Sequence, residues 1–332
     1  MSENVAYGFA VGRIRVQETT LLDRSRYERL VRAANAAELR SVLTDTCYGR
    51  YIAEDAEPHL PKYSVSFNRI LIQAAADNFD FLARYCTDHW VLDAFRLRAD
   101  IHNLKLAVKH RLLGTESVEA QMFPYGTWHA SQVRALAAAE PGAEPSRVRH
   151  AVVEALKGPE PWSVDAVFDR LEQELVLELV RPSLFLSRLF AIHADVENLR
   201  TLVRIRLTGR GRAVLRQVFL PGGELTLTML TELLGADLDT MVARFRFSRY
   251  RELVEQGHSS ATNRAFRRTE SLGRELLLNW LKLARYATFG YEPLVSYYLF
   301  RENEITNLRQ LFAAKAAGAT EQECRELIAY VD

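Results

Sequence analysis

A motif that occurs three times constrains the fold of this chain more than any other feature of its sequence. Each copy has an acidic residue, an asparagine three positions later, then a leucine and a basic residue. A second base follows eleven positions after the acid, and a glycine follows fourteen positions after it. The three copies are Asp100–Gly114, Asp195–Gly209 and Glu304–Gly318. Because the spacing is identical, we infer an internal repeat of one structural unit.

Helix geometry predicts what each motif position does. Positions one, four, seven and eight after the acid form one apolar stripe, which in the first copy is Ile101, Leu104, Ala107 and Val108. The acid, the asparagine, the late base and the glycine lie along one edge of this stripe, where half-buried polar groups need hydrogen-bond partners. The glycine is expected to end the helix in a left-handed conformation. The bases five positions after the acid lie toward the opposite face and cannot pair with their own acid.

Two interpretations of the motif remain open. In the structural one, the acid and the asparagine tie each helix to a neighbour or a loop, and each asparagine bonds within its own unit. In the functional one, three equivalent polar and basic edges face a common axis and receive a partner. The motif residues at issue are Asp100, Asn103, Lys105, Arg111, Asp195, Asn198, Arg200, Arg206, Glu304, Asn307, Arg309 and Lys315.

The rest of the sequence predicts an all-α chain. The best strand candidate, Glu224–Leu230, alternates only briefly, and Thr228 there is equally suited to cap a helix; Ser131 is a second cap candidate. Asn35 and Thr320 each precede a glutamate by three positions, which is capping-box spacing. We therefore predict three pseudo-symmetric helical units, which span residues 1–118, 119–213 and 214–332.

Composition limits the classes of function. The 43 basic and 42 acidic residues nearly cancel, which disfavours a general attraction to nucleic acid or anionic lipid. Three widely spaced cysteines, Cys47, Cys86 and Cys324, fit a reducing cytosol rather than a disulfide framework. We expect no signal peptide. Charged residues interrupt the two most apolar stretches, Leu175–Ile192 and Leu276–Phe300, so we expect no direct membrane span.

An arginine-rich run supplies a candidate partner-binding patch. It lacks the interleaved aromatic residues that stack on nucleic-acid bases, and an acidic protein surface is a better match. The predicted contact residues are Arg204, Arg210, Arg212 and Arg216.

Catalytic and metal-binding signals are weak. Cys86 and His89 have the spacing of half a zinc site, but no second pair is evident. Asp77 and Asp80 are the nearest match to the Mg²⁺ motifs of an α-helical enzyme, but they lack an adjacent aspartate pair and a second motif. No nucleotide-binding glycine loop or hydrolase motif is present. We therefore predict no metal, no cofactor and no catalytic residue.

The repeat and both ends of the chain resemble the C subunit of the A/V-type rotary ATPases, the family of the eukaryotic d subunit. The opening YGFAVGRIR at 7–15 and the segment LTDTCY at 43–48 are similar to its N-terminal signature. The segment ENEITNLR at 302–309 is similar to its last motif. The resemblance covers 7–331, and the Pro- and Ala-rich stretch 137–160 matches less well.

This resemblance implies a funnel-like helical assembly that is not an enzyme. Its wide end would receive the rotor shaft subunits, and its base would sit on the proteolipid ring of the membrane sector. Such a component of the central stalk would couple ATP synthesis or hydrolysis to proton or sodium transport. It would be cytoplasmic and peripheral to the membrane. A generic helical adaptor between proteins is the alternative function.

Overall fold

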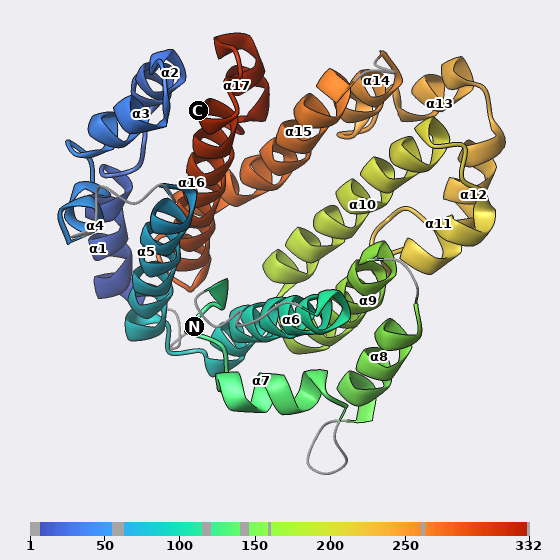
Figure 1. Ribbon diagram of the computed structural model, residues 1–332, viewed down its shortest axis with the longest axis horizontal. Helices are drawn as coiled ribbons and strands as arrows, with labels where there is room; N and C mark the ends of the chain where they lie inside the picture. Colours follow the sequence, from blue (N-terminus) through green and yellow to red (C-terminus); the bar gives the residue numbers. More distant parts are fainter. Residues whose placement is uncertain are drawn as a thin grey trace. The chain divides into compact units, whose positions relative to one another are not determined.

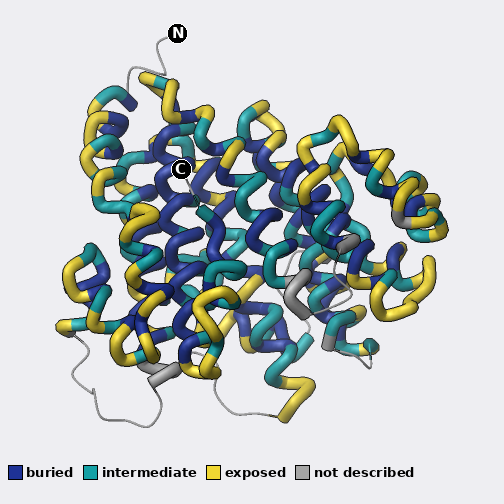
Figure 2. The backbone as a smooth tube through the Cα atoms, turned by 90° about the horizontal axis from the view of Figure 1, so that it is seen from above, coloured by how far each residue is buried: buried dark blue, intermediate teal, exposed yellow. Residues whose placement is uncertain are grey.

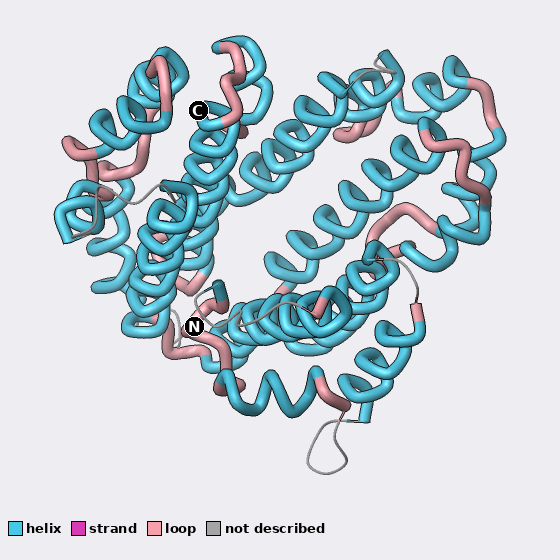
Figure 3. Tube along the Cα trace, viewed as in Figure 1, coloured by secondary structure: helices cyan, strands magenta, loops and turns pink. Residues whose placement is uncertain are grey.

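The computed structural model describes residues 7–54, 63–114, 121–139, 146–158, 161–259 and 263–330. These residues form helices, turns and loops, and none of them lies in a strand (Figure 3). The all-α prediction is therefore confirmed. The segment 224–230, which was the best strand candidate, leads into a helix that begins at Leu227.

The chain divides into two compact units, which we describe separately (Figure 1). The terminal unit combines Met1–Asp88 with Thr262–Asp332, and the middle unit is His89–Ala261. The terminal unit contains α1 (Gly8–Glu18), α2 (Arg24–Arg32), α3 (Ala36–Leu43), α4 (Gly49–Glu54), α5 (Tyr63–Tyr85), α15 (Asn263–Leu281), the 3₁₀ helix η3 (Lys282–Tyr286), α16 (Glu292–Ala316) and α17 (Glu321–Leu327). The middle unit contains α6 (His89–Leu113), α7 (Ala130–Ala137), α8 (Ser146–Lys157), α9 (Pro161–Val180), α10 (Leu184–Leu207), α11 (Arg212–Val218), α12 (Leu227–Gly235), α13 (Leu238–Phe245) and α14 (Arg251–Ser259).

The three motifs lie on the long helices α6, α10 and α16. The predicted apolar stripe is buried in every copy, and buried residues run along the packed helices (Figure 2). Each motif glycine adopts a positive φ, which is 64° at Gly114, 65° at Gly209 and 75° at Gly318. Since that conformation favours glycine, the predicted helix-ending role is confirmed.

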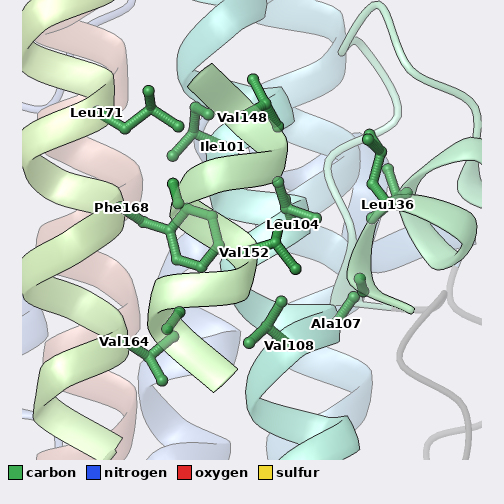
Figure 4. Close-up of a cluster of buried hydrophobic side chains, with 14 of the residues drawn as sticks. Ile101, Leu104, Ala107, Val108, Leu136, Val148, Val152, Val164, Phe168 and Leu171 are labelled. Atoms are coloured by element: carbon green, nitrogen blue, oxygen red, sulfur yellow. The ribbon is translucent and has the colours of Figure 1, made fainter. Parts of the chain in front are cut away.

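The core of the middle unit is built around α6 and α9, with α7 and α8 packed against them. Phe168 of α9 is fully buried and lies among Ile101, Leu104 and Val152 (Figure 4). In the terminal unit, α16 packs against α5, and the rings of Phe67 and Phe312 stack with centroids 4.0 Å apart. In both units a motif helix therefore supplies its stripe to the core.

Two of the four predicted helix caps are correct. The side chain of Asn35 accepts from the amides of the first turn of α3, and Thr320 forms a full capping box with Glu323. The other two were misplaced. Thr226, not Thr228, caps α12, and Ser131 lies inside α7, which His129 precedes. Each misplaced candidate is the second residue of its helix, where the extended backbone of an N-cap residue is excluded.

Replacing the central aromatic ring of the middle unit tests this packing. We expect Phe168→Ala to lower the free energy of unfolding by about 3–5 kcal/mol, because a large side chain leaves a cavity in a closed core. Urea unfolding followed by circular dichroism measures the change. The control is Leu184→Ala, at a side chain that is 81% exposed, which should shift stability by less than about 0.5 kcal/mol. Equal effects of the two variants would contradict the assigned core.

Candidate partner-binding site

The asparagine of each motif forms a two-way hydrogen bond with one backbone residue of a following loop. Its amide nitrogen donates to the carbonyl, and its side-chain oxygen accepts from the amide of the same residue. The pairs are Asn103 with Phe123, Asn198 with Leu220 and Asn307 with Ala329, at 2.8–3.1 Å. All three asparagines are buried, so their predicted hydrogen-bonding role is confirmed.

The expectation that each asparagine bonds within its own unit holds only for Asn307. With unit boundaries at 118 and 213, Phe123 and Leu220 fall in the next predicted unit. The loop after each motif is bound to the motif helix that precedes it. The three-unit division itself stays a prediction.

In the first two copies, the motif acid binds the same loop as the asparagine, from one helical turn away. In the second copy, Asp195 accepts from the amides of Glu224 at 3.0 Å and Leu225 at 2.9 Å, and from the hydroxyl of Tyr250 at 2.7 Å. In the first copy, Asp100 accepts from the amide of Trp128 at 2.9 Å. We call the buried acid and asparagine of each motif the acid–Asn pair. The carboxylates are buried, whereas the sequence predicted that they would be half-buried.

In the third copy, residues near the start of the chain bind the acid. Glu304 accepts from the amide of Leu22, from the hydroxyl of Tyr48 at 3.0 Å and from the guanidinium of Arg301 at 2.6 Å. Burial raises the pKa of Glu304, and it also raises the pKa of Asp195. The donors around each acid lower its pKa and offset part of this desolvation.

Two glycines allow the loops to approach the acids. A Cβ atom added to Gly223 would overlap Oδ1 of Asp195, and one added to Gly126 would overlap Oδ1 of Asp100. Each glycine stands three residues after the residue that its asparagine binds. The repeated Phe-Pro-Tyr-Gly and Leu-Pro-Gly-Gly sequences therefore serve the acid–Asn pair.

Adding a methyl group at these glycines tests the close approach. We expect Gly223→Ala to lower the free energy of unfolding by roughly 1–3 kcal/mol, because the new Cβ displaces a buried carboxylate from its donors. Gly12→Ala is the matched control, since nothing lies within 4 Å of its added Cβ. That variant should stabilise the helix by about 0.5–1 kcal/mol. A Gly223→Ala protein as stable as wild type in urea would refute the assigned contact.

The late bases of the first two motifs also have structural partners. Arg111 donates to the carbonyl of Ala137 at 2.6 Å, and Arg206 donates to the carbonyl of Leu233 at 2.7 Å. Both carbonyls lie at the C-terminal ends of short helices, where a cation complements the helix dipole. Lys315, the third late base, is buried. Arg111 nevertheless remains exposed, and Arg206 is half-buried.

The bases five positions after the acids contact other side chains, as their predicted orientation requires. Lys105 of α6 pairs with Asp169 and, at 3.7 Å, with Asp165 of α9. Arg309 of α16 donates to Asn68 of α5 at 3.1 Å. In the second copy, Arg200 pairs with Glu197 on its own helix.

The predicted arginine patch is divided between two cavities of the middle unit. Arg204 and Arg210 line a cavity of about 580 Å³ between α6, α9, α10 and α11, where Arg210 lies over the ring of Trp162 at 5.2 Å. Arg212 and Arg216 line a smaller cavity of about 280 Å³ between α11 and α12. All four arginines are exposed, so the patch is accessible but not continuous within one cavity.

Some residues of the site were not predicted from the sequence. The tyrosine donors Tyr48 and Tyr250 were not assigned, although each stands two residues after a hydroxyl residue, Thr46 or Ser248. The acids of α9 that pair with Lys105 were also missed, because pairing between two helices distant in sequence depends on their packing. The one sequence feature that could have indicated the tyrosine donors is the hydroxyl-x-Tyr spacing that the two segments share.

A buried histidine lines the larger cavity. The Nδ1 atom of His193 is buried and has no hydrogen-bond partner among the described residues. Its pKa is lowered to about 4, chiefly by burial and also by the charges of Arg98 and Arg200, while Glu172 acts in the opposite direction.

This histidine makes stability depend on pH. In the unfolded chain it binds a proton near pH 6.5, but in the folded protein only near pH 4. The contribution of neutral His193 to the free energy of unfolding is therefore complete above pH 6.5 and is lost as pH falls toward 4. We expect wild type to lose on the order of 2–3 kcal/mol more than His193→Gln over this range. Chemical unfolding at a series of pH values measures both; parallel curves would exclude the histidine as the cause.

Among the described residues, no helix is both long enough and apolar enough to cross a bilayer. The same residues contain no group of three or more histidine, cysteine or acidic side chains suited to hold a metal ion. Cys86 lies 3.6 Å from the Tyr7 hydroxyl, and Asp77 pairs with Arg50 at 2.8 Å. Cys86 and Asp77, one residue from each pair considered for zinc or Mg²⁺, therefore have protein partners.

The fold and its acid–Asn pairs define an all-helical repeat protein whose motif polar groups bind its own loops. The chain belongs to the ATP synthase (C/AC39) subunit family, whose model matches residues 10–327. It is 23% identical to the C subunit of the A-type ATP synthase of Methanocaldococcus jannaschii, over 97% of this chain and 86% of the relative. It is 24% identical to the corresponding protein of Methanosarcina mazei, over 98% of this chain and 93% of that relative. The corresponding protein of Pyrococcus abyssi is 20% identical, with 97% and 90% covered.

Proposed function

We propose that this chain is the non-catalytic central-stalk subunit that couples the rotor shaft to the proteolipid ring of an A/V-type ATP synthase. The observation that carries the proposal is the family match across residues 10–327. The curated relatives are named as C subunits of A-type ATP synthases, and this chain spans most of their length. In this role the protein binds no nucleotide and works at the cytoplasmic face of the membrane through its partners.

The internal bonding of the chain suits a part that transmits torque. In the second and third copies, buried hydrogen bonds from the acid–Asn pair tie a long helix to a neighbouring segment, and the corresponding bonds of the first copy are partly buried. Buried bonds of this kind cost more to break than exposed ones, because the separated groups stay unsatisfied. A rotor link built in this way resists shear between its helices. A funnel-like arrangement of the three repeats, with the shaft at its wide end, completes the proposal.

The exposed arginines of the middle unit are the proposed rotor contacts. Arg212 and Arg216 line the groove between α11 and α12 together with Leu227, which offers charge and an apolar surface side by side. Arg204 and Arg210 lie at the larger cavity. Guanidinium groups bind carboxylates in a bidentate manner, so an acidic surface of a shaft or ring protein is the matching partner.

Reconstitution with and without this chain tests the coupling role. ATP-driven ion pumping should require the chain, while ATP hydrolysis by the catalytic sector should continue in its absence. Reversing the groove charges in Arg212→Glu/Arg216→Glu should lower the ratio of pumping to hydrolysis at least several-fold, because an acidic partner is then repelled. The matched control is Arg149→Glu, an exposed arginine on α8. Fully coupled pumping without the chain would leave the generic helical adaptor as its function.

A further inference from the structure

Two turns of the protein share one internal construction. The turn at 43–48 leads into α4, and the turn at 245–250 leads into α14. In the first, the amide of Tyr48 donates to the hydroxyl of Thr46 at 3.2 Å; in the second, the amide of Tyr250 donates to that of Ser248, also at 3.2 Å. We call them the tyrosine turns, because the hydroxyl of each tyrosine donates to a motif acid, Glu304 or Asp195.

The hydroxyl residues of both turns also donate back to the chain. Thr46 donates to the carbonyl of Leu43 at 2.6 Å, and Ser248 donates to the carbonyl of Phe245 at 3.0 Å. Leu43 and Phe245 are both buried. Each turn is thus held by one buried apolar residue, one hydroxyl and one tyrosine.

The outward residues of the two turns differ in kind. At the position immediately before the hydroxyl residue, the terminal unit has the exposed Asp45, whereas the middle unit has Phe247. The side chain of Phe247 is 96% exposed. Since the turn of the terminal unit forms with an aspartate there, the fold does not require an aromatic ring at this position. Folding therefore leaves this ring free to serve as an aromatic anchor for a partner, provided that its surroundings suit one.

Arginines flank this phenylalanine in the sequence. Arg244, Arg246 and Arg249 are all exposed, and Arg246 lies over the ring of Phe247 at 5.5 Å. Within the described part of the chain, none of the three takes part in an ion pair. The six residues of this turn carry two arginines and no acid, whereas those of the other turn carry one aspartate and no base. Its outward surface is therefore aromatic and cationic.

We propose that the tyrosine turn of the middle unit docks on an acidic protein surface, with Phe247 inserted in an apolar pocket and the flanking arginines bound to carboxylates. The partner is a neighbouring subunit of the ATP synthase complex, so this inference rests on the proposed function. Aromatic residues and arginine are the side chains that dominate protein–protein binding energy. The basic residues of 191–259 other than histidine are all arginine, whose planar fork fits carboxylate oxygens.

The composition of the turn favours a protein over the other anionic partners. Anchoring to a bilayer surface requires a broad apolar face, and this turn exposes one aromatic ring beside a serine. Single-stranded nucleic acid is bound by a series of stacking rings along a basic groove. A single ring framed by guanidinium groups instead matches one pocket with an acidic rim.

Binding of the purified full chain to ATP synthase complex prepared without it tests the inference. Biolayer interferometry at two salt concentrations gives Kd. We expect Phe247→Ser to raise Kd at least tenfold, because the variant lacks the aromatic ring that fills the pocket of the partner. Arg246→Glu/Arg249→Glu should raise Kd and make it less sensitive to salt, because attraction between exposed charges is screened. Asp45→Ser, at the equivalent turn, is the matched control and should leave Kd unchanged.

Each outcome supports or overturns the inference. If the wild-type protein binds the complex and Phe247→Ser binds with the same Kd, the inference is overturned while the proposed function stands. Absence of wild-type binding overturns the proposed function as well. Phe247-dependent binding to phosphatidylglycerol vesicles or to DNA, without binding to the complex, replaces the protein partner with a membrane or nucleic acid. Because Ser248 and Tyr250 are retained, we expect the variants to fold. Thermal unfolding of each variant checks this. A benzophenone amino acid at 247 should crosslink to an acidic segment of a neighbouring subunit.

Discussion

The structure depends on buried acid–Asn pairs that bind backbone rather than one another. A carboxylate in a protein interior is unfavourable unless several donors face it, and an unpaired backbone amide is nearly as costly. In each pair, backbone amides donate to the buried acid, so neither the carboxylate nor the amides are left without a hydrogen-bond partner. Asp195, with two amides and the Tyr250 hydroxyl, is the most complete case. The spacing of the motif follows, because residues three apart on a helix project on the same side; in the first two copies they reach successive parts of one loop.

The third pair explains why the two ends of the chain form one compact unit. Asn307 binds Ala329, close to the end of the chain, while Glu304 binds Leu22 and Tyr48 from its beginning. Arg301 adds a buried ion pair with Glu304 and a hydrogen bond to Thr20. An ion pair in this setting is costly to break from one side, since a lone charge would remain buried. The repeat at the C-terminal end is therefore completed by the N-terminal segment.

The residues that hold the fold together are not the residues proposed to bind partners. The acids, the asparagines and the first two late bases bind other parts of the chain, whereas the proposed partner contacts are exposed arginines and Phe247 of the middle unit. The two tyrosine turns show the separation most directly. Their inward residues match in role, whereas Asp45 in one and Phe247 in the other give opposite surface character. A repeated scaffold can therefore present different surfaces to different partners without any change to the bonds that hold it.

The sequence by itself determined the helical class, the three motif helices, their buried stripes and their terminal glycines. These features follow from local periodicity and from the backbone preferences of single residues, which act over one or two helical turns. Only the tertiary structure decided that Tyr48 and Tyr250 bind the motif acids, that Lys105 pairs with acids of α9, and that the arginine patch is divided between two cavities. Such contacts join residues far apart in the chain. Their geometry depends on how helices pack, and no local spacing encodes that packing.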